Sequence, residues 1–142
     1  MYCSKSSNAR VNAVHKRALR AITGDYSSSL DELICTTHVK TIHQMNIEVL
    51  LTEIYKCQSD DHPDIMRSLF IPKTPFYFLR NSMLLQLPQT KSVRYGINSV
   101  FFRGVQLWNS VPDMIKLCES ADSFKKKVGS WSGLNCSCKL CR

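Results

Sequence analysis

The feature that most constrains the fold of this chain is a long helical pattern at residues 39–57. Apolar residues recur along it at the spacing of a helix and form two neighbouring stripes. The first stripe consists of Ile47, Leu50, Leu51, Ile54 and Cys57, and the second of Ile42, Met45 and Val49. Two neighbouring stripes indicate a helix that is buried on much of its circumference. We expect this helix, the longest in the chain, to lie at the centre of the fold.

Two further helices are predicted before this central one. Residues 8–23 carry a single apolar stripe that consists of Val11, Val14, Ala18, Leu19 and Ile22. Gly24 follows as a C-terminal stop. Ser29 and Glu32 have the spacing of a capping box, which predicts a short helix that continues to Ile34.

Four shorter helical patterns follow the central helix. Residues 63–70 predict a short amphipathic helix. Residues 99–110 predict a second one, in which Gly104 shares a face with Val100, Leu107 and Trp108 and allows close packing of helices. Pro112 and Asp113 begin a further turn, with Met114, Ile115 and Leu117 available for burial. Ser120 is expected to cap a last helix with a buried edge of Phe124, Val128 and Trp131.

The intervening residues 71–98 are broken by Pro72 and Pro75, and they predict an extended, irregular crossover. Residues 84–87 have the composition of a brief strand that ends at Pro88. The expected fold class is therefore mainly α. It is a compact single unit of about six short helices with an irregular crossover and room for one minor hairpin. We expect residues 1–131 to form this helical domain and residues 132–142 to form a flexible, Cys-rich tail.

Composition restricts the class of protein further. The chain has 142 residues, 44% of them apolar and 21% charged, which is typical of one globular domain. It has no run of about 18 apolar residues for a membrane span and no signal peptide. We therefore expect an intracellular protein, nuclear or cytoplasmic. The seven cysteines are an odd number and indicate reduced thiols rather than a disulfide framework.

Charge is distributed unevenly along the chain. Residues 1–24 contain five basic and no acidic side chains, residues 25–66 contain eight acidic and two basic, and residues 67–142 contain twelve basic and three acidic. This asymmetry favours a polyanionic partner for one or both ends. The candidate phosphate contacts are Arg10, Lys16, Arg17, Arg20, Lys125, Lys126 and Lys127. The alternative is that these side chains are solvated and have no partner.

The sequence YGINSVFFRGVQLWNSVPD, at residues 95–113, carries a family resemblance. It resembles the Y-G-x-x-S-x-x-(F/Y)-R-G-x-x-L-W-N-x-(L/V)-P-D signature near the C-terminus of reverse transcriptases from non-LTR (LINE-type) retrotransposons. Four other segments match this family in the same order, and together they extend the resemblance over nearly the whole chain. They are VHKRALRAI at 14–22, YSSSLDEL at 26–33, LRN at 79–81 and DSFKKK at 122–127.

The resemblance implies the thumb or linker region that follows the catalytic palm. The family places two adjacent aspartates at a hairpin tip to hold Mg²⁺, and the Asp-Asp pair here, Asp60 and Asp61, has no preceding aromatic residue and no flanking strand pattern. We interpret it as a polar loop in which Asp61 caps the next helix and Pro63 lies in its first turn. We therefore expect this chain alone to have no polymerase activity. It would support weak, non-specific RNA or DNA binding and contact the polymerase core of the parent protein.

Two alternatives stay open. In the first alternative, the chain is a stand-alone nucleic-acid-binding or zinc-binding module. In the second, it is an element remnant without function. The zinc hypothesis depends on Cys136, Cys138 and Cys141, which supply three thiolates of the four ligands that tetrahedral zinc needs. The fourth would come from Cys118, His15 or another subunit.

Aromatic residues offer one more hypothesis. Phe101, Phe102, Trp108 and Trp131 could stack on single-stranded bases. Their helical spacing instead favours core positions for Trp108 and Trp131.

Overall fold

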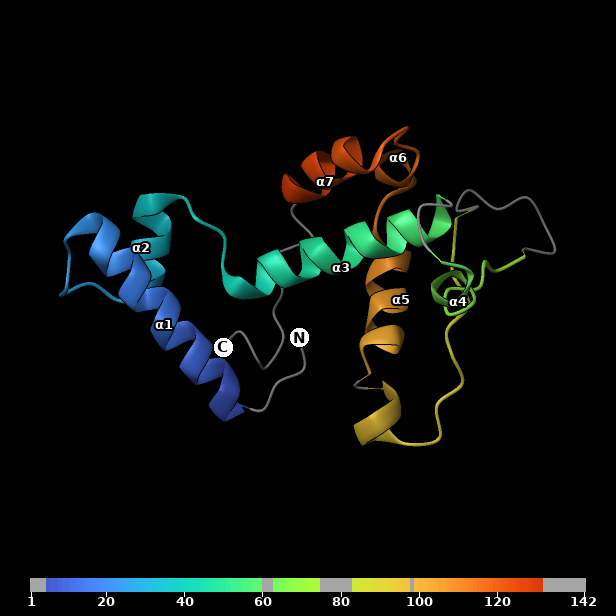
Figure 1. Ribbon diagram of the computed structural model, residues 1–142, viewed down its shortest axis with the longest axis horizontal. Helices are drawn as coiled ribbons and strands as arrows, with labels where there is room; N and C mark the ends of the chain where they lie inside the picture. Colours follow the sequence, from blue (N-terminus) through green and yellow to red (C-terminus); the bar gives the residue numbers. More distant parts are fainter. Residues whose placement is uncertain (1–4, 60–62, 75–82, 98, 132–142) are drawn as a thin grey trace. The chain divides into compact units, whose positions relative to one another are not determined.

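The computed structural model describes residues 5–59, 63–74, 83–97 and 99–131 (Figure 1). The described part of the chain contains seven α-helices, one short π-helical turn and no strand, so the prediction of a mainly α fold is confirmed. Contacts group the described residues into two compact units, one of residues 5–46 and one that begins at residue 47. Each unit is described by itself.

The first unit is built from two helices whose ends are fixed locally. Helix α1 spans Lys5–Thr23 and ends at Gly24, whose φ of 71° lies in the left-handed region. Helix α2 spans Leu30–Thr37 and begins with the predicted capping box. Glu32 N donates to Ser29 Oγ at 3.3 Å, and Ser29 N donates to Glu32 Oε2 at 2.7 Å.

A second reciprocal cap fixes the start of helix α3, which spans Ile42–Gln58. Thr41 N donates to Gln44 Oε1 at 2.9 Å, and Gln44 N donates to Thr41 Oγ1 at 3.1 Å. These bonds place the first helical residue at Ile42 rather than at residue 39 as expected. Helix α3 has 17 residues and is shorter than α1, which has 19, so the expectation that it is the longest helix was wrong.

The packing of the first unit buries only one residue of the predicted apolar stripe of α1. Helices α1 and α2 are in contact, and Leu19 and Leu33 are the residues that this contact buries. Val11, Val14 and Ile22 are 43%, 64% and 77% exposed. Leu19 is therefore the one member of the expected stripe that lies on the side of α2. The reason is that α2 has only eight residues and covers one side of α1.

In the second unit, α3 provides the central apolar surface. Ile47, Leu51, Ile54 and Cys57 are buried, as the first predicted stripe requires. The second stripe is not buried in the same way, because Val49 is 56% exposed. Two residues outside both stripes, Thr52 and Tyr55, are buried instead. The buried face of α3 is therefore turned from the expected second stripe towards Tyr55.

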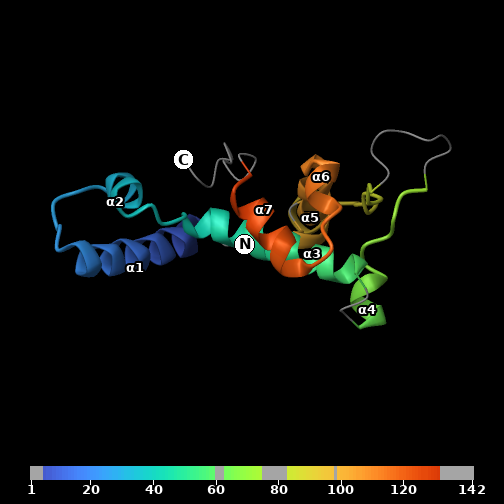
Figure 2. The same ribbon diagram turned by 90° about the horizontal axis from the view of Figure 1, so that it is seen from above.

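Three later helices complete the second unit: α5 (Val100–Ser110), α6 (Asp113–Lys116) and α7 (Ala121–Gly129). Both views show α5 and α7 beside α3 (Figures 1 and 2). Gly104 of α5 is buried against α3, since a Cβ added to it would lie 3.1 Å from Cδ1 of Ile54. The prediction that Gly104 allows close helix packing is therefore confirmed.

Aromatic rings connect α3, α5 and α7 in the core. The rings of Tyr55 and Phe124 stack with centroids 4.4 Å apart, and the rings of Trp108 and Phe124 lie 5.8 Å apart. The Tyr55 hydroxyl also donates to the carbonyl of Cys118, which precedes α7. Such pairs add about 0.5–1.5 kcal/mol beyond the area they bury. The interior of this unit thus depends on one residue from each of three helices.

The segment between α3 and α5 is irregular, as expected. Helix α4 spans Asp64–Arg67, and its N-cap is Pro63, which was expected within the first turn; Asp61 lies outside the described residues. Pro72 and Leu85 form an isolated antiparallel bridge. In the described part of the chain this bridge takes the place of the brief strand expected at residues 84–87. The turn η1 (Val93–Ile97) then contacts α5.

Apolar side chains of two short helices are not buried as expected. In and beside α4, Ile65 and Leu69 are 74% and 42% exposed, and Phe70 is buried. In α6, Met114 and Leu117 are 83% and 65% exposed. Helices of four residues cannot present a complete apolar face. No residue within α4 is buried, and the buried residue of α6 is Lys116. None of the helices in the described residues is both long and apolar enough to cross a membrane.

Candidate nucleic-acid interface

The basic triplet Lys125, Lys126 and Lys127 lies on α7, and all three side chains are exposed as predicted. Phe124 and Val128 flank the triplet in sequence and are fully buried. With 3.6 residues per turn, Lys126 points away from the edge that carries Phe124 and Val128, and its two neighbours lie on the flanks. The packed core therefore fixes the direction in which these three ammonium groups project.

The position of the lysines within α7 also matters for the helix itself. Lys126 and Lys127 are in its last turn, and Asp122 is in its first turn. Both placements are favourable in the field of the helix dipole. Ser120 caps the helix by accepting a hydrogen bond from Ser123 N at 3.2 Å. The triplet is thus compatible with a stable α7 even though three like charges are adjacent.

The four candidate phosphate contacts on α1 do not form one surface. Arg10 and Arg17 are exposed, whereas Lys16 and Arg20 are half-buried. Arg20 Nη2 donates to the carbonyl of Ser28 at 3.3 Å, so this guanidinium ties α1 to the turn that precedes α2. Arg20 Nε is buried without a hydrogen-bond partner. The side of α1 that faces α2 therefore uses part of the basic set for packing.

Two carboxylates lie in the same turn region. Asp25 Oδ1 accepts from Ser27 N at 2.9 Å, from Ser27 Oγ at 2.8 Å and from Ser28 N at 3.2 Å. The hydroxyl of Ser28, the hydroxyl of Ser27 and the two backbone N–H groups keep the pKa of Asp25 well below its usual range. Hydrogen bonds from the backbone and the hydroxyl of Ser29 likewise lower the pKa of Glu32. The positive charge of Lys16 lowers it further. These anions weaken the attraction of Lys16 and Arg20 for phosphate.

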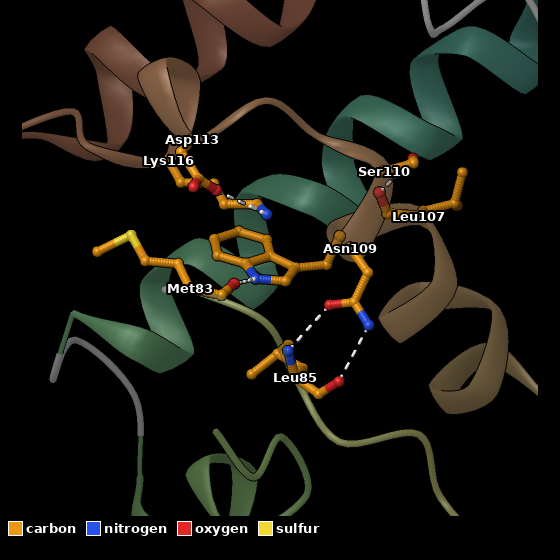
Figure 3. A network of polar contacts seen from close by, with 8 residues as sticks. Met83, Leu85, Leu107, Asn109, Ser110, Asp113 and Lys116 are labelled. Carbon is orange, nitrogen blue, oxygen red and sulfur yellow. Dashed lines mark hydrogen bonds and ion pairs between the residues drawn. The ribbon is translucent and has the colours of Figure 1, made fainter. Parts of the chain in front are cut away.

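The LWNSVPD part of the signature proves to be a packing element (Figure 3). Trp108 is 3% exposed, and its Nε1 donates to the carbonyl of Met83 at 2.9 Å. Asn109 makes two hydrogen bonds to the backbone of Leu85, one from Leu85 N to Oδ1 at 2.9 Å and one from Nδ2 to Leu85 O at 3.0 Å. We call Trp108 and Asn109, with the backbone of residues 83–85, the Trp–Asn clamp. It fastens the irregular crossover to α5.

Residues at the end of the signature lie beside the indole ring of this clamp (Figure 3). Pro112 is the N-cap of α6, and Asp113 begins that helix. Asp113 Oδ1 lies 3.4 Å from Nζ of Lys116, whose side chain is completely buried. The same ammonium lies 5.6 Å from the centroid of the Trp108 ring. Burial lowers the pKa of Lys116, and the nearby carboxylate of Asp113 partly opposes this shift.

The hypotheses of base stacking have different outcomes for the different aromatic residues. Trp108 is a core residue, which confirms the prediction. Phe102 is half-buried. Trp131 is also half-buried, so its predicted core position is not confirmed; it lies beyond the end of α7 at Gly129. Phe101 is 42% exposed, and its ring lies 6.0 Å from that of the buried Phe70. Sequence reasoning missed the partners of the signature, Met83 and Leu85, because they are 25 and 24 residues away and no local pattern connects them.

The proposed zinc ligands Cys136, Cys138 and Cys141 lie outside the described residues. Among the described residues there is no group of three His, Cys, Asp or Glu side chains that could hold a metal ion. Cys118, a candidate fourth ligand, is half-buried, and its thiol donates to the carbonyl of Ile115 at 2.9 Å. A zinc site in the tail therefore stays a prediction.

The chain was compared with protein-family models, with curated proteins and with solved structures, and none of them matches it. The case for a function depends on the residues described above and on the motif resemblance.

Proposed function

We propose that this chain is the post-palm segment of an RNA-directed DNA polymerase of the non-LTR retrotransposon type. In this role it supports the binding of RNA or DNA and does not itself catalyse polymerisation. The observation that carries the proposal is the lysine triplet of α7, which projects from a helix anchored by the fully buried Phe124 and Val128. Cations carried on the outer side of a packed helix can contact phosphates and orient a nucleic acid without reading its sequence.

The Trp–Asn clamp supports the same proposal indirectly. Its aromatic and amide groups are occupied by the backbone of residues 83–85 and by Phe124. These groups maintain the fold and are unavailable for contacts with bases. The exposed cations of α7 are then the groups proposed to face a polyanion. Binding through such groups is expected to be weak, salt-dependent and insensitive to sequence.

The binding experiment uses the full 142-residue chain and fluorescence anisotropy with labelled single-stranded RNA, single-stranded DNA and duplex DNA. If about four phosphates are neutralised, log K should fall with log salt at a slope near −3 to −4 between about 50 and 200 mM salt. The double variant Lys126→Glu/Lys127→Glu should bind more weakly and should reduce the magnitude of this slope by about 2. Circular dichroism should show unchanged folding, since both side chains are exposed.

A matched control separates a defined surface from net charge alone. Lys73→Glu/Lys91→Glu makes the same change in charge at two exposed lysines of the same unit. The control should weaken binding by less than the α7 pair does. Equal losses for the two double variants would mean that net charge, and not α7, is responsible. Tight binding to one sequence that is insensitive to salt would also contradict the proposal.

The absence of catalysis is tested separately. Primer extension on an RNA template with the purified chain and Mg²⁺ should give no product, because two-metal phosphoryl transfer needs the carboxylate pair of the palm. Asp60→Ala is the control, since Asp60 and Asp61 are the adjacent aspartates of this sequence. Reproducible extension that disappears in Asp60→Ala would overturn this part of the proposal.

A further inference from the structure

Helix α1 presents a stripe of apolar side chains to solvent. Val11, Val14, Ala18 and Ile22 follow one another at intervals of three, four and four residues, so they lie along one face of the helix. Val11, Val14 and Ile22 are 43%, 64% and 77% exposed, and Ala18 is also exposed. Single exposed apolar residues are common on protein surfaces. Four of them in a continuous row are typical of a surface that binds a partner.

The fold of the first unit does not explain this stripe. Helix α2 packs against the side of α1 that carries Leu19 and Arg20, through the buried Leu33 and the bond from Arg20 to Ser28. Leu19 alone contributes a fully packed apolar side chain from α1 to this contact. The local stability of the two-helix unit therefore does not require the residues of the stripe to be apolar.

Charge beside the stripe indicates the chemistry of the missing partner. Arg10 precedes Val14 by four residues and Arg17 follows it by three, so both arginines lie next to the stripe on the helix surface. Both are exposed. Residues 1–24 contain five basic side chains and no acidic one. A surface that covers the stripe would have to bring carboxylates close to Arg10 and Arg17 to be complementary in charge.

We infer that α1 is a docking helix that inserts Val11, Val14, Ala18 and Ile22 into an apolar groove with an acidic rim on another polypeptide. The spacing of the four side chains is that of a helix bound in a groove, in which residues i, i+3, i+7 and i+11 act as anchors. Arg10 and Arg17 would pair with the rim. The small side chain of Ala18 would allow the wall of the groove to approach the helix closely.

Other occupants fit the stripe less well. A second copy of α1 would place basic helices beside each other without any acidic residue to compensate. A lipid surface is usually engaged through Trp, Phe or Leu, and the stripe contains Val, Ala and Ile instead. A nucleic acid would satisfy the arginines but offers no apolar groove for Val14 and Ile22. The inference is independent of the proposed function, which rests on α7.

The test uses calcium-loaded calmodulin as a probe, because its calcium-bound form exposes an apolar groove that accepts basic amphipathic helices. The full chain should bind this probe in an isothermal titration, and chelation of calcium should abolish binding. Val14→Asp/Ile22→Asp should weaken binding at least tenfold. Met114→Asp/Leu117→Asp, which changes two other exposed apolar residues, should leave it unchanged. Circular dichroism of both double variants verifies that they are folded.

Each other outcome has a defined meaning. Absence of probe binding, or equal loss in both double variants, would overturn the inference. Binding to vesicles of anionic lipid that requires Val14 and Ile22, without probe binding, would assign α1 to a membrane surface. Self-association in sedimentation that Val14→Asp/Ile22→Asp abolishes would assign it to a second copy. Lys126→Glu/Lys127→Glu should lose nucleic-acid affinity and keep probe binding, so failure of this inference is distinguishable from failure of the proposed function.

Discussion

The side-chain amide of Asn109 binds the backbone of Leu85 through both of its polar atoms, accepting from Leu85 N at 2.9 Å and donating to Leu85 O at 3.0 Å. A neighbouring strand would normally make these two bonds. In this protein one side chain of α5 makes them instead. The crossover between α4 and α5 can therefore be irregular and still have its backbone polar groups satisfied at Leu85.

Asn109→Ala should be strongly destabilising for this reason. Leu85 is 3% exposed, and water cannot readily replace the lost amide. Each buried group left without a partner costs about 1–3 kcal/mol. Urea unfolding followed by tryptophan fluorescence measures the effect, since both tryptophans, Trp108 and Trp131, lie in the second unit. Ser110→Ala is the matched control, because it removes a single hydrogen bond from an exposed hydroxyl to the carbonyl of Leu107. It should lower the free energy of unfolding by less than about 1 kcal/mol.

Two substitutions of Trp108 separate packing from its hydrogen bond. Trp108→Ala should lower the free energy of unfolding by about 3–5 kcal/mol, because the side chain fills the space beside Phe124. Trp108→Phe keeps an apolar ring and loses the bond from Nε1 to Met83, so it should cost less. Thermal melts by circular dichroism measure both. A Trp108→Ala variant with normal stability and nucleic-acid affinity reduced by about 1–3 kcal/mol would instead indicate base stacking.

Larger residues at Gly24 and at Gly104 should be limited by different causes, the backbone conformation at Gly24 and the neighbouring side chains at Gly104. At Gly104 the Cβ of alanine would lie 3.1 Å from Cδ1 of Ile54 and 3.5 Å from Cδ2 of Leu50, both tips of flexible side chains, so the gain in helix propensity of about 1 kcal/mol should offset these contacts. Gly104→Val should cost about 1–3 kcal/mol, and Ile54→Val in the same chain should restore part of the loss. Gly24 has open space around it but a φ of 71°, so Gly24→Ala should cost about 1–2 kcal/mol through the backbone alone.

The buried Lys116 should give the protein a specific dependence on alkaline pH. Its pKa in the folded state is lowered from 10.5, mainly by burial. Between the lowered value and 10.5 the unfolded chain binds more protons than the folded chain, so the free energy of unfolding rises with pH. Lys116→Met lacks this rise. The difference in unfolding free energy between wild type and Lys116→Met should therefore increase up to about pH 10.5, in urea titrations at several pH values.

A second buried group makes this comparison of variants necessary. Burial raises the pKa of the Cys57 thiol, and the negative charge of Glu53 raises it further. A raised pKa contributes stability below its ordinary value of 9.0 that is lost as pH rises through the folded-state pKa. Cys57 therefore acts in the opposite direction to Lys116 over the same range. Its contribution is the same in both chains and cancels in the difference, and a flat difference would contradict the role given to Lys116.

The ends of the helices could be predicted because their signals are local. Ser29 with Glu32 and Ser120 with Ser123 are separated by three residues, and their side chains make the caps that the sequence predicts. The reciprocal cap of Thr41 and Gln44 has the same spacing and was overlooked, which explains the error of three residues at the start of α3.

The buried faces of helices were harder to predict than their ends. An apolar stripe shows which residues can be buried, but the partner helix decides which of them are. In α1 the stripe and the packed side diverge, since Val14 is exposed and Leu19 is buried. The lysines of α7 are exposed, as expected. In α1, Arg17 is exposed but Arg20 is half-buried, because Arg20 bonds to the carbonyl of Ser28 in a turn eight residues away.

Because α7 carries both the lysine triplet and the fully buried Phe124 and Val128, its charge and its packing cannot be separated by shortening the chain. A truncation that ends before residue 121 would remove the partner rings of Tyr55 and Trp108 along with the lysines. Loss of binding in such a fragment would report unfolding as much as loss of contact. Deletion mapping, a common first approach to a binding region, would therefore be a misleading test of the proposed α7 surface, whereas substitutions that change charge at constant length test it directly.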